Sequence, residues 1–142
     1  RKPYEVLIIA SIIEREVHRE EDRAKVARVI YNRLDKDRKL ELDSTVTYAE
    51  NLKTTTTTKK DRQSKSKYNT YRYKGLPPGP ISAPGKAALE AAANPENGKW
   101  LYFVTVNLDT GETKFAEKQT DFEKIRLEFQ RWCQSHPGRC ES

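Results

Sequence analysis

The chain has 142 residues, of which 35% are hydrophobic and 34% charged, and it carries a net charge of +6 with a pI near 9.3. This length suits one domain with a small core that needs neither a metal nor a set of disulfides. The absence of any run of about 18 apolar residues argues against a membrane-spanning helix in the chain. The positive charge favours an anionic partner, a description that fits nucleic acid, acidic lipid and anionic wall polymer equally well.

An amphipathic helix is predicted over residues 6–17, close to the start of the chain. Residues 1–5 lack the apolar region of a signal peptide, so we expect one domain, residues 1–142, with its targeting segment upstream. Glu14 lies at the edge of the apolar stripe and Glu16 near the opposite edge, so the helical pattern leaves open which carboxylate is special. The stripe consists of Val6, Ile9, Ala10, Ile13 and Val17.

The next elements are also helical. Apolar residues repeat with helical spacing over residues 21–34, which predicts a second helix. A short third helix follows to Tyr48, capped by Asp43 or Ser44. Residues 51–67 have almost no apolar side chain to bury and are predicted to form a flexible, low-complexity loop.

The second half of the chain mixes irregular structure with a small sheet. Tyrosines, prolines and glycines over residues 68–85 predict an irregular, ordered surface. An alanine-rich helix is predicted over residues 86–93. The β-branched and aromatic residues at 100–106 and 113–116 flank a turn, which is typical of a β-hairpin. This order of elements predicts an α+β domain with several helices and a small antiparallel sheet.

A last helix is predicted to begin at a capping box formed by Thr120 and Glu123. It leads into a C-terminal tail, residues 134–142, with a turn-rich spacer between Cys133 and Cys140. Two alternatives remain for these cysteines, a disulfide or a pair of free thiols. Too few other soft ligands lie nearby for a zinc site.

Glu14 is the first candidate for chemistry. A carboxyl bordered by apolar side chains has its pKa raised by desolvation, which is the property of a general acid. The alternative is an ordinary ion pair with Arg15, Lys25 or His18 at the edge of the helix. No serine or cysteine triad, dinucleotide loop, phosphate-binding loop or zinc spacing is present, which disfavours those chemistries.

Two further features leave alternatives open. Asp43 is either the second carboxylate of a hydrolytic glycosidase or a simple helix cap. Residues 68–73 combine tyrosine rings with amides and hydroxyls, which suits stacking on sugars and reading their polar groups. The same mixture with flanking lysines suits stacking on single-stranded bases, and the tyrosines can also serve only to fill an irregular loop.

Five sequence blocks, taken together and in this order, are more specific than any one alone. They are ASIIERE at 10–16, YNRL at 31–34, LDSTVTY at 42–48, YNTY at 68–71 and GLPPGPI at 75–81. In this order they resemble the YceG-like catalytic domain of the endolytic murein transglycosylases, the MltG family. The resemblance continues to about Phe122 and leaves out the threonine-rich insertion and the C-terminal tail.

The resemblance implies an enzyme that cleaves the β-1,4 bond between N-acetylmuramic acid and N-acetylglucosamine in peptidoglycan. It implies that Glu14, the glutamate of the A-S-I-[IV]-E motif, is the acid and base that forms a 1,6-anhydro product without a cofactor or metal. The residues implied to bind substrate are Asn32, Asp43, Ser44, Thr45, Tyr48, Tyr68, Asn69, Thr70, Tyr71 and Pro78.

The same resemblance bears on partners and location. It implies peptidoglycan strands as substrate, peptidoglycan synthases as partners and no nucleic acid. Family members act outside the cytoplasmic membrane, at the cell wall, and are anchored by a helix that this chain lacks. The remaining alternatives are a muramidase that uses water and a non-catalytic binding module for cell wall or single-stranded nucleic acid.

Overall fold

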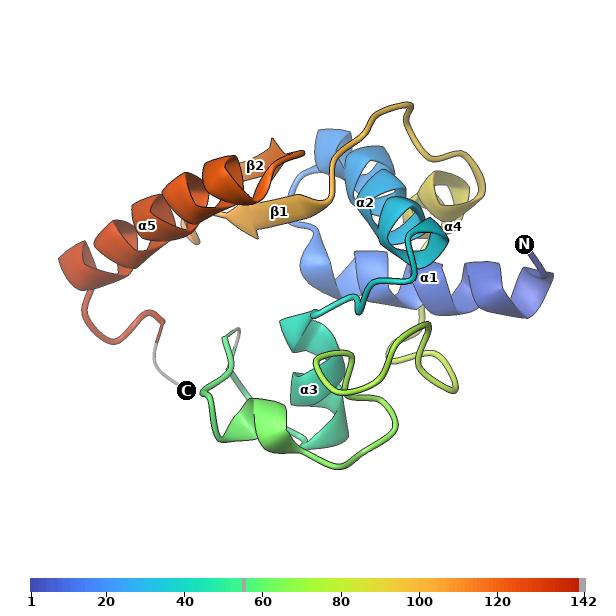
Figure 1. Cartoon of the computed structure of the whole chain (residues 1–142), viewed down its shortest axis with the longest axis horizontal. Coiled ribbons are helices and arrows are strands. Elements are labelled where there is room, and N and C mark those ends of the chain that lie inside the picture. The colour runs from blue at the N-terminus through green and yellow to red at the C-terminus, as the bar shows by residue number, and fades with distance from the viewer. Residues whose placement is uncertain (55, 141–142) are drawn as a thin grey trace.

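The computed structural model describes residues 1–54 and 56–140, which form five α-helices and one two-stranded antiparallel sheet (Figure 1). This arrangement confirms the predicted α+β class. Two short 3-10 turns, Glu20–Asp22 and Asp61–Gln63, lie between the longer elements. The elements are α1 (Pro3–Glu16), α2 (Arg23–Asp35), α3 (Asp43–Ala49), α4 (Lys86–Ala93), β1 (Tyr102–Thr105), β2 (Thr113–Ala116) and α5 (Gln119–Ser135).

Helix α1 lies at the centre of the core. Its residues 8–13 are all buried, because the helix packs against α2, α3 and α4 on several sides. A helix that is apolar all round is stable only between other elements, and Figure 1 shows α1 passing beneath α2 and α4. It begins at Pro3, earlier than predicted, since proline suits the first turn of a helix. It ends at Glu16 because Val17 is extended.

Ser11 attaches the proline-rich segment to this central helix. Its buried hydroxyl donates to the carbonyl oxygen of Ile8 at 2.6 Å and accepts from the N–H of Ile81 at 3.0 Å. The hydroxyl of Ser82 donates to the carbonyl oxygen of Ser11 at 2.8 Å. These bonds satisfy polar groups that burial would otherwise leave without partners. They hold residues 75–85, which are irregular as predicted, against α1.

The hairpin forms as predicted and carries α5. Tyr102 pairs with Ala116 and Thr105 with Thr113, and the positive φ of Gly111, 76°, lies in the turn between the strands. The ring of Tyr102 stacks on Phe122 of α5, with centroids 4.6 Å apart. No residue of α5 is fully buried, so this helix lies on the surface of the molecule along the hairpin (Figure 1).

Two predicted helix caps are wrong. Helix α5 begins at Gln119 without a side-chain cap, so the capping box of Thr120 and Glu123 does not form. Glu123 pairs with Arg126 at 3.0 Å instead. Helix α3 already includes Asp43 and likewise has no side-chain cap hydrogen bond. Tertiary contacts occupy the Asp43 carboxylate and the Ser44 N–H at the start of α3.

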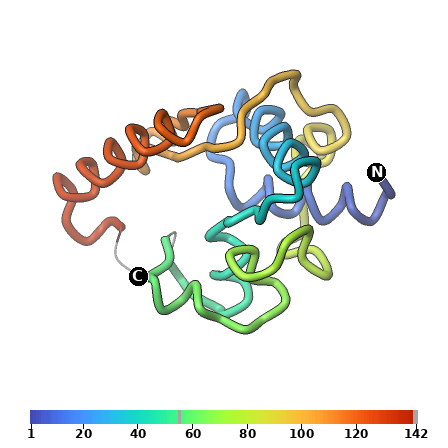
Figure 2. Tube along the Cα trace, viewed as in Figure 1, coloured from blue at the N-terminus to red at the C-terminus, as the bar shows by residue number. Residues whose placement is uncertain are grey.

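The threonine-rich loop and the C-terminal tail meet. The hydroxyl of Thr56 donates to the carbonyl oxygen of Cys140 at 2.5 Å, and the chain trace in Figure 2 shows the tail returning toward the loop. Cys133 and Cys140 form a disulfide with their Cα atoms 5.8 Å apart, which confirms the first of the two alternatives. No helix within residues 1–54 and 56–140 combines the length and apolarity that crossing a membrane requires.

Candidate active site

A cleft of about 910 Å³ lies between two sides of the molecule. Helix α5 and the hairpin form one side, and the start of α3 with part of the threonine-rich loop forms the other (Figure 1). The last residues of α1 and one face of α2 complete the lining. Residues that the following argument uses are Glu16, Arg33, Asp43, Ser44, Tyr71 and Tyr102.

Glu16, the last residue of α1, places its carboxylate in this cleft. Its Oε2 accepts a hydrogen bond from the backbone N–H of Ser44 at 3.1 Å. That N–H lies in the first turn of α3, where helical amides lack partners within their own helix. Glu16 therefore replaces the side-chain cap that α3 lacks and connects α1 to α3.

Burial gives this carboxyl an unusual protonation equilibrium. The pKa of Glu16 rises from 4.5 to about 6, and desolvation is the main cause. The negative charge of Asp43 also raises this pKa, while hydrogen bonding from Ser44 and the charge of Arg15 oppose the rise. A carboxyl with this pKa is substantially protonated in mildly acidic conditions. It can therefore donate a proton and then act as a base in the same reaction.

Asp43 is the second carboxylate in the cleft, and three donors surround it. Its Oδ1 accepts from the hydroxyl of Thr57 at 2.8 Å and from the hydroxyl of Tyr71 at 2.5 Å. Arg62 Nε lies 3.8 Å from the same oxygen. Burial, and then the charge of Asp43, raise the pKa of Tyr71, so its hydroxyl remains a donor. Asp43 thus connects the threonine-rich loop and residue 71 to α3.

Ser44 supplies an unused polar group. The residue lines the cleft and is only 8% exposed. Its hydroxyl makes no hydrogen bond of ordinary geometry within residues 1–54 and 56–140, but it lies close enough to the Glu16 carboxylate to oppose the rise of that pKa. A buried hydroxyl without a partner costs free energy unless a ligand or water completes it. Its place beside the Glu16 carboxylate makes it available to a hydroxyl of a bound substrate.

The opposite side of the cleft is aromatic. Tyr102 and Phe103 come from β1, and Phe122 and Phe129 from α5. The guanidinium of Arg33 lies 5.0 Å from the centre of the Tyr102 ring. A cleft with flat apolar rings on one side and fixed polar groups on the other suits a ligand with both kinds of surface, as a sugar chain has.

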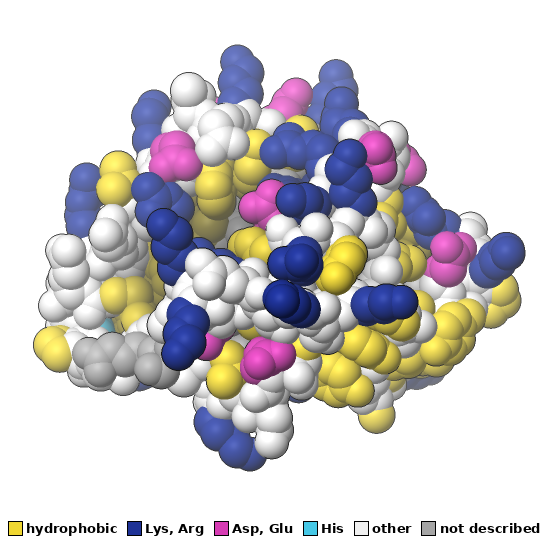
Figure 3. All heavy atoms as spheres, turned by 60° about the horizontal axis from the view of Figure 1, so that its bottom comes forward, with side chains coloured by type: hydrophobic (Ala, Val, Ile, Leu, Met, Phe, Trp, Pro, Cys, Tyr) yellow, Lys and Arg dark blue, Asp and Glu magenta, His cyan; other side chains and the backbone are white. Residues whose placement is uncertain are grey.

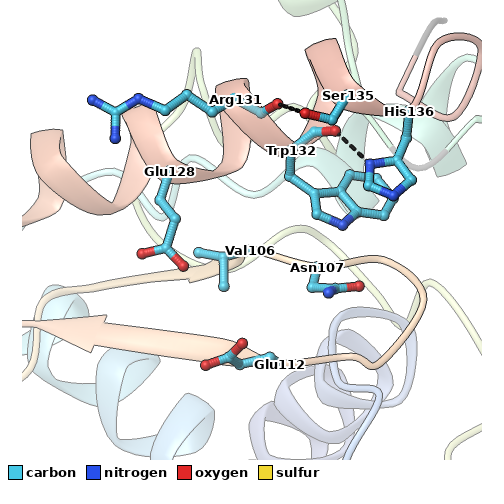
Figure 4. A pocket seen from close by; sticks show the side chains of 8 residues that line it. All are labelled: Val106, Asn107, Glu112, Glu128, Arg131, Trp132, Ser135 and His136. Atoms are coloured by element: carbon cyan, nitrogen blue, oxygen red, sulfur yellow. Dashed lines mark hydrogen bonds between the residues drawn. The ribbon is translucent and has the colours of Figure 1, made fainter.

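A second, smaller hollow of about 270 Å³ lies between the hairpin turn and the last turns of α5 (Figure 4). Several of its polar side chains are occupied internally: His136 Nδ1 bonds to the carbonyl oxygen of Trp132 at 2.8 Å, and Glu128 pairs with Lys114 at 2.7 Å. None of the predicted site residues lines it. Within the part of the chain that the structure describes, no group of acidic, histidine and cysteine residues is arranged to hold a metal.

The model of the YceG-like family matches residues 1–127. The chain belongs to the YceG-like family.

Similar proteins share this YceG-like domain as part of longer chains. An endolytic murein transglycosylase of Bacillus subtilis is 37% identical over 126 residues, which are 89% of this chain and 34% of that protein. One from Streptococcus pneumoniae serotype 2 is 34% identical over 125 residues, covering 84% of this chain and 22% of that protein. The crystal structure of a YceG-like protein from Listeria monocytogenes has a TM-score of 0.81 and 43% identity, over 86% of this chain and 39% of the other. The domain thus spans well under half of each relative.

In the YceG-like domain, three of the ten residues predicted to bind substrate line the cleft, namely Asp43, Ser44 and Tyr71. Three others lie buried behind them. Thr45 and Thr70 share a hydrogen bond of 2.9 Å between their hydroxyls, and Asn69 donates to the carbonyl oxygens of Arg62 and Ser64. These side chains are fully buried and shape the loop that carries Tyr71.

The other four predicted residues lie outside the described lining of the cleft. Asn32 donates to the carbonyl oxygens of Gly98 and Trp100, at 3.1 and 2.9 Å. Tyr48 packs on Tyr68 with ring centroids 5.1 Å apart, and Pro78 is exposed in the proline-rich segment.

Glu14 lies in different surroundings from those predicted. It is exposed, and its Oε1 accepts from the N–H of Gly85 at 2.8 Å. Gly85 is the residue that precedes α4, so the carboxylate interacts favourably with a helix N-terminus. The expectation that apolar side chains surround Glu14 is therefore wrong. Within residues 1–54 and 56–140, Glu14 forms no ion pair with a basic side chain. It is also not among the residues that line the cleft.

Proposed function

We propose that this domain cleaves peptidoglycan glycan strands as a lytic transglycosylase, with Glu16 as general acid and base. The observation that carries the proposal is the Glu16 carboxyl, held in the cleft with a pKa near 6. The names of the similar proteins from Bacillus and Streptococcus support murein as the substrate. Glu16 takes the role that the family resemblance implied for Glu14, because Glu14 lies outside the described lining of the cleft.

In this reaction a single carboxyl acts first as general acid and then as general base. Protonated Glu16 donates its proton to the glycosidic oxygen between N-acetylmuramic acid and N-acetylglucosamine as that β-1,4 bond breaks. Positive charge then develops at C1 of the muramyl residue. The carboxylate of Glu16 removes the proton of the muramyl 6-hydroxyl, whose oxygen attacks C1. The product carries a 1,6-anhydro ring, the proton returns to Glu16, and no water is consumed.

The surroundings of Asp43 favour this route over hydrolysis by a pair of carboxylates. Glycosidases that use water or a covalent intermediate require a second carboxylate free to act as base or nucleophile. The Oδ1 of Asp43 already accepts from Thr57 and Tyr71 and lies near Arg62. Asp43 is therefore suited to hold the cleft wall, with its charge acting on Glu16.

The substrate also determines where the domain works. Peptidoglycan lies outside the cytoplasmic membrane, so the proposal places the domain at the cell wall on the extracytoplasmic face. Enzymes that synthesise the strands are then its natural neighbours and partners.

The product identifies the reaction directly. We expect mass spectrometry of peptidoglycan incubated with this domain to show new anhydro-muramyl ends. New reducing ends would mean that water is the nucleophile. Binding of strands without either product, from a domain shown to be folded, would contradict catalysis by this domain and favour the non-catalytic binding module.

Asp43→Asn is expected to change how cleavage depends on pH. The charge of Asp43 raises the pKa of Glu16, so removing that charge lowers this pKa. The decline of kcat on the alkaline side should therefore begin at a lower pH, since less Glu16 is protonated at each pH. The measurement is the rate of release of anhydro products across pH 4 to 8. Asp121→Asn, which removes an exposed carboxylate of α5, is the control, and a shift of the Asp43 variant toward higher pH would contradict the coupling.

A further inference from the structure

The positive charge of the chain is concentrated in one segment. Residues 53–74 contain eight lysine or arginine residues and one acidic residue, a net charge of +7. The rest of the chain has 19 basic and 20 acidic residues and is close to neutral. The net charge of +6 therefore comes entirely from this segment, which we name the basic segment.

The charges of the basic segment face solvent and are mostly unpaired. All eight basic side chains are exposed. Lys74 pairs with Asp37 at 3.2 Å, and Arg62 lies 3.8 Å from Asp43. The other six form no ion pair with any residue in the ranges 1–54 and 56–140. Like charges held together without counter-charges repel each other, so the folded protein bears a cost that an anionic partner would offset.

The basic segment forms the underside of the molecule in Figure 1. Figure 3 brings that side forward and shows dark-blue side chains spread across it rather than gathered in one groove. Two exposed aromatic rings belong to this region: Tyr73, within the segment, is 39% exposed, and Tyr48, which precedes it in the chain, is 43% exposed. Tyrosine with an apolar ring and a polar end suits the boundary between lipid and water.

We infer that the basic segment docks the domain on the surface of an anionic lipid bilayer. Six of its eight cations are lysines, which act as point charges toward a diffuse anionic surface, whereas arginine is preferred for paired bonds to single phosphates. Single-stranded nucleic acid is held by several rings that stack on successive bases. In the basic segment Tyr71 donates to Asp43 inside the cleft and Tyr68 packs on Tyr48, so Tyr73 is the one exposed ring among its three tyrosines.

Docking in this way orients the cleft. Thr57 and Arg62 belong to the basic segment and also line the cleft. The cleft therefore opens beside the face that meets the lipid headgroups. The inference depends on charge and exposure alone and holds whether or not the domain cleaves peptidoglycan.

The test is sedimentation of the 142-residue chain with vesicles. We expect binding to vesicles of equal parts phosphatidylcholine and phosphatidylglycerol, and much weaker binding to phosphatidylcholine alone. Replacing Lys59, Lys65 and Lys67 with glutamine should lower the partition coefficient about 100-fold, since each cation near an anionic surface contributes about fivefold. Raising the salt concentration should weaken binding by the wild type.

The matched control replaces Lys99, Lys118 and Lys124 with glutamine, which removes the same charge from exposed lysines elsewhere. We expect this variant to lose less than about threefold, because charges far from the surface are screened. Equal losses by the two variants would overturn the inference. Tighter binding to a single-stranded oligonucleotide than to the anionic vesicles, at equal phosphate concentration, would also overturn it and identify nucleic acid as the partner.

Discussion

Replacing Glu16 with glutamine is expected to lower the rate of strand cleavage by about 10²- to 10⁴-fold, the usual contribution of a general acid and base. Glutamine has the shape of glutamate and still accepts the hydrogen bond from Ser44, but it has no acidic proton to donate. The cleft should therefore keep its structure and its affinity for strands. The measurement is the initial rate at which anhydro ends appear, with strand binding measured in parallel.

The same substitution should make the protein more stable at neutral pH. The pKa of Glu16 is raised in the folded state, from 4.5 to about 6, so protonation favours folding. That stabilisation is complete below pH 4.5 and is lost as the pH rises through 6. At pH 8 the ionised carboxylate lowers the free energy of unfolding by about 2 kcal/mol relative to acid conditions. Urea unfolding at both pH values should show the glutamine variant more stable than wild type at pH 8, with the difference shrinking at pH 4.5.

Glu14→Gln is the matched control for both measurements, since it makes the same change two residues away. Glu14 is exposed and bonded to Gly85, so its replacement should leave cleavage nearly unchanged and alter stability by about 0.5 kcal/mol or less. If Glu14→Gln abolished cleavage while Glu16→Gln retained it, the proposed role of Glu16 would be wrong. The family motif would then have identified the acid correctly from sequence alone.

Helical periodicity predicted the first two helices because each buries an apolar surface of its own, and alanine content predicted α4. The bounds of α4, Lys86–Ala93, agree with the prediction to the residue. Helix ends were harder to predict because they depend on partners elsewhere in the chain. The first turn of α3 donates a hydrogen bond to Glu16, which is 28 positions away, and no local pattern contains that information.

The candidate site was likewise predictable from the sequence only in part. Asp43, Ser44 and Tyr71 were expected to bind substrate and do line the cleft. The choice between Glu14 and Glu16 required the tertiary structure, because α1 is buried on several sides and its middle turns leave no single polar face. Asn69 and Thr70 carry groups suited to reading sugars, yet the backbone of an irregular loop uses those groups first.

The aromatic side of the cleft was not predicted as part of a site. Tyr102 and Phe103 fit a strand, and Phe122 and Phe129 fit the apolar face of a helix, so their sequence pattern is fully explained by packing. The structure shows that these rings also line the cleft.

Arg33 joins the two sides of this cleft and was likewise not predicted as important by itself. It is only 7% exposed. Its Nε donates to the carbonyl oxygen of Leu101 at 2.6 Å, and its Nη1 donates to that of Lys39 at 2.7 Å. Leu101 leads into β1 and Lys39 precedes α3. One guanidinium therefore connects α2 to the chain segments that lead into the two sides of the cleft.

Arg33→Met is expected to lower the free energy of unfolding by about 2–4 kcal/mol, because two enclosed carbonyl groups lose their donor. Methionine keeps much of the side-chain volume, so the loss reports the hydrogen bonds more than a cavity. Urea unfolding measures it, and Arg28→Met on the same helix is the control. Arg28 also donates to one carbonyl, that of Glu96 at 2.6 Å, but at an exposed position, so its loss should cost about 1 kcal/mol or less. Equal losses would mean that solvent reaches both sites alike and that Arg33 does not hold the cleft together.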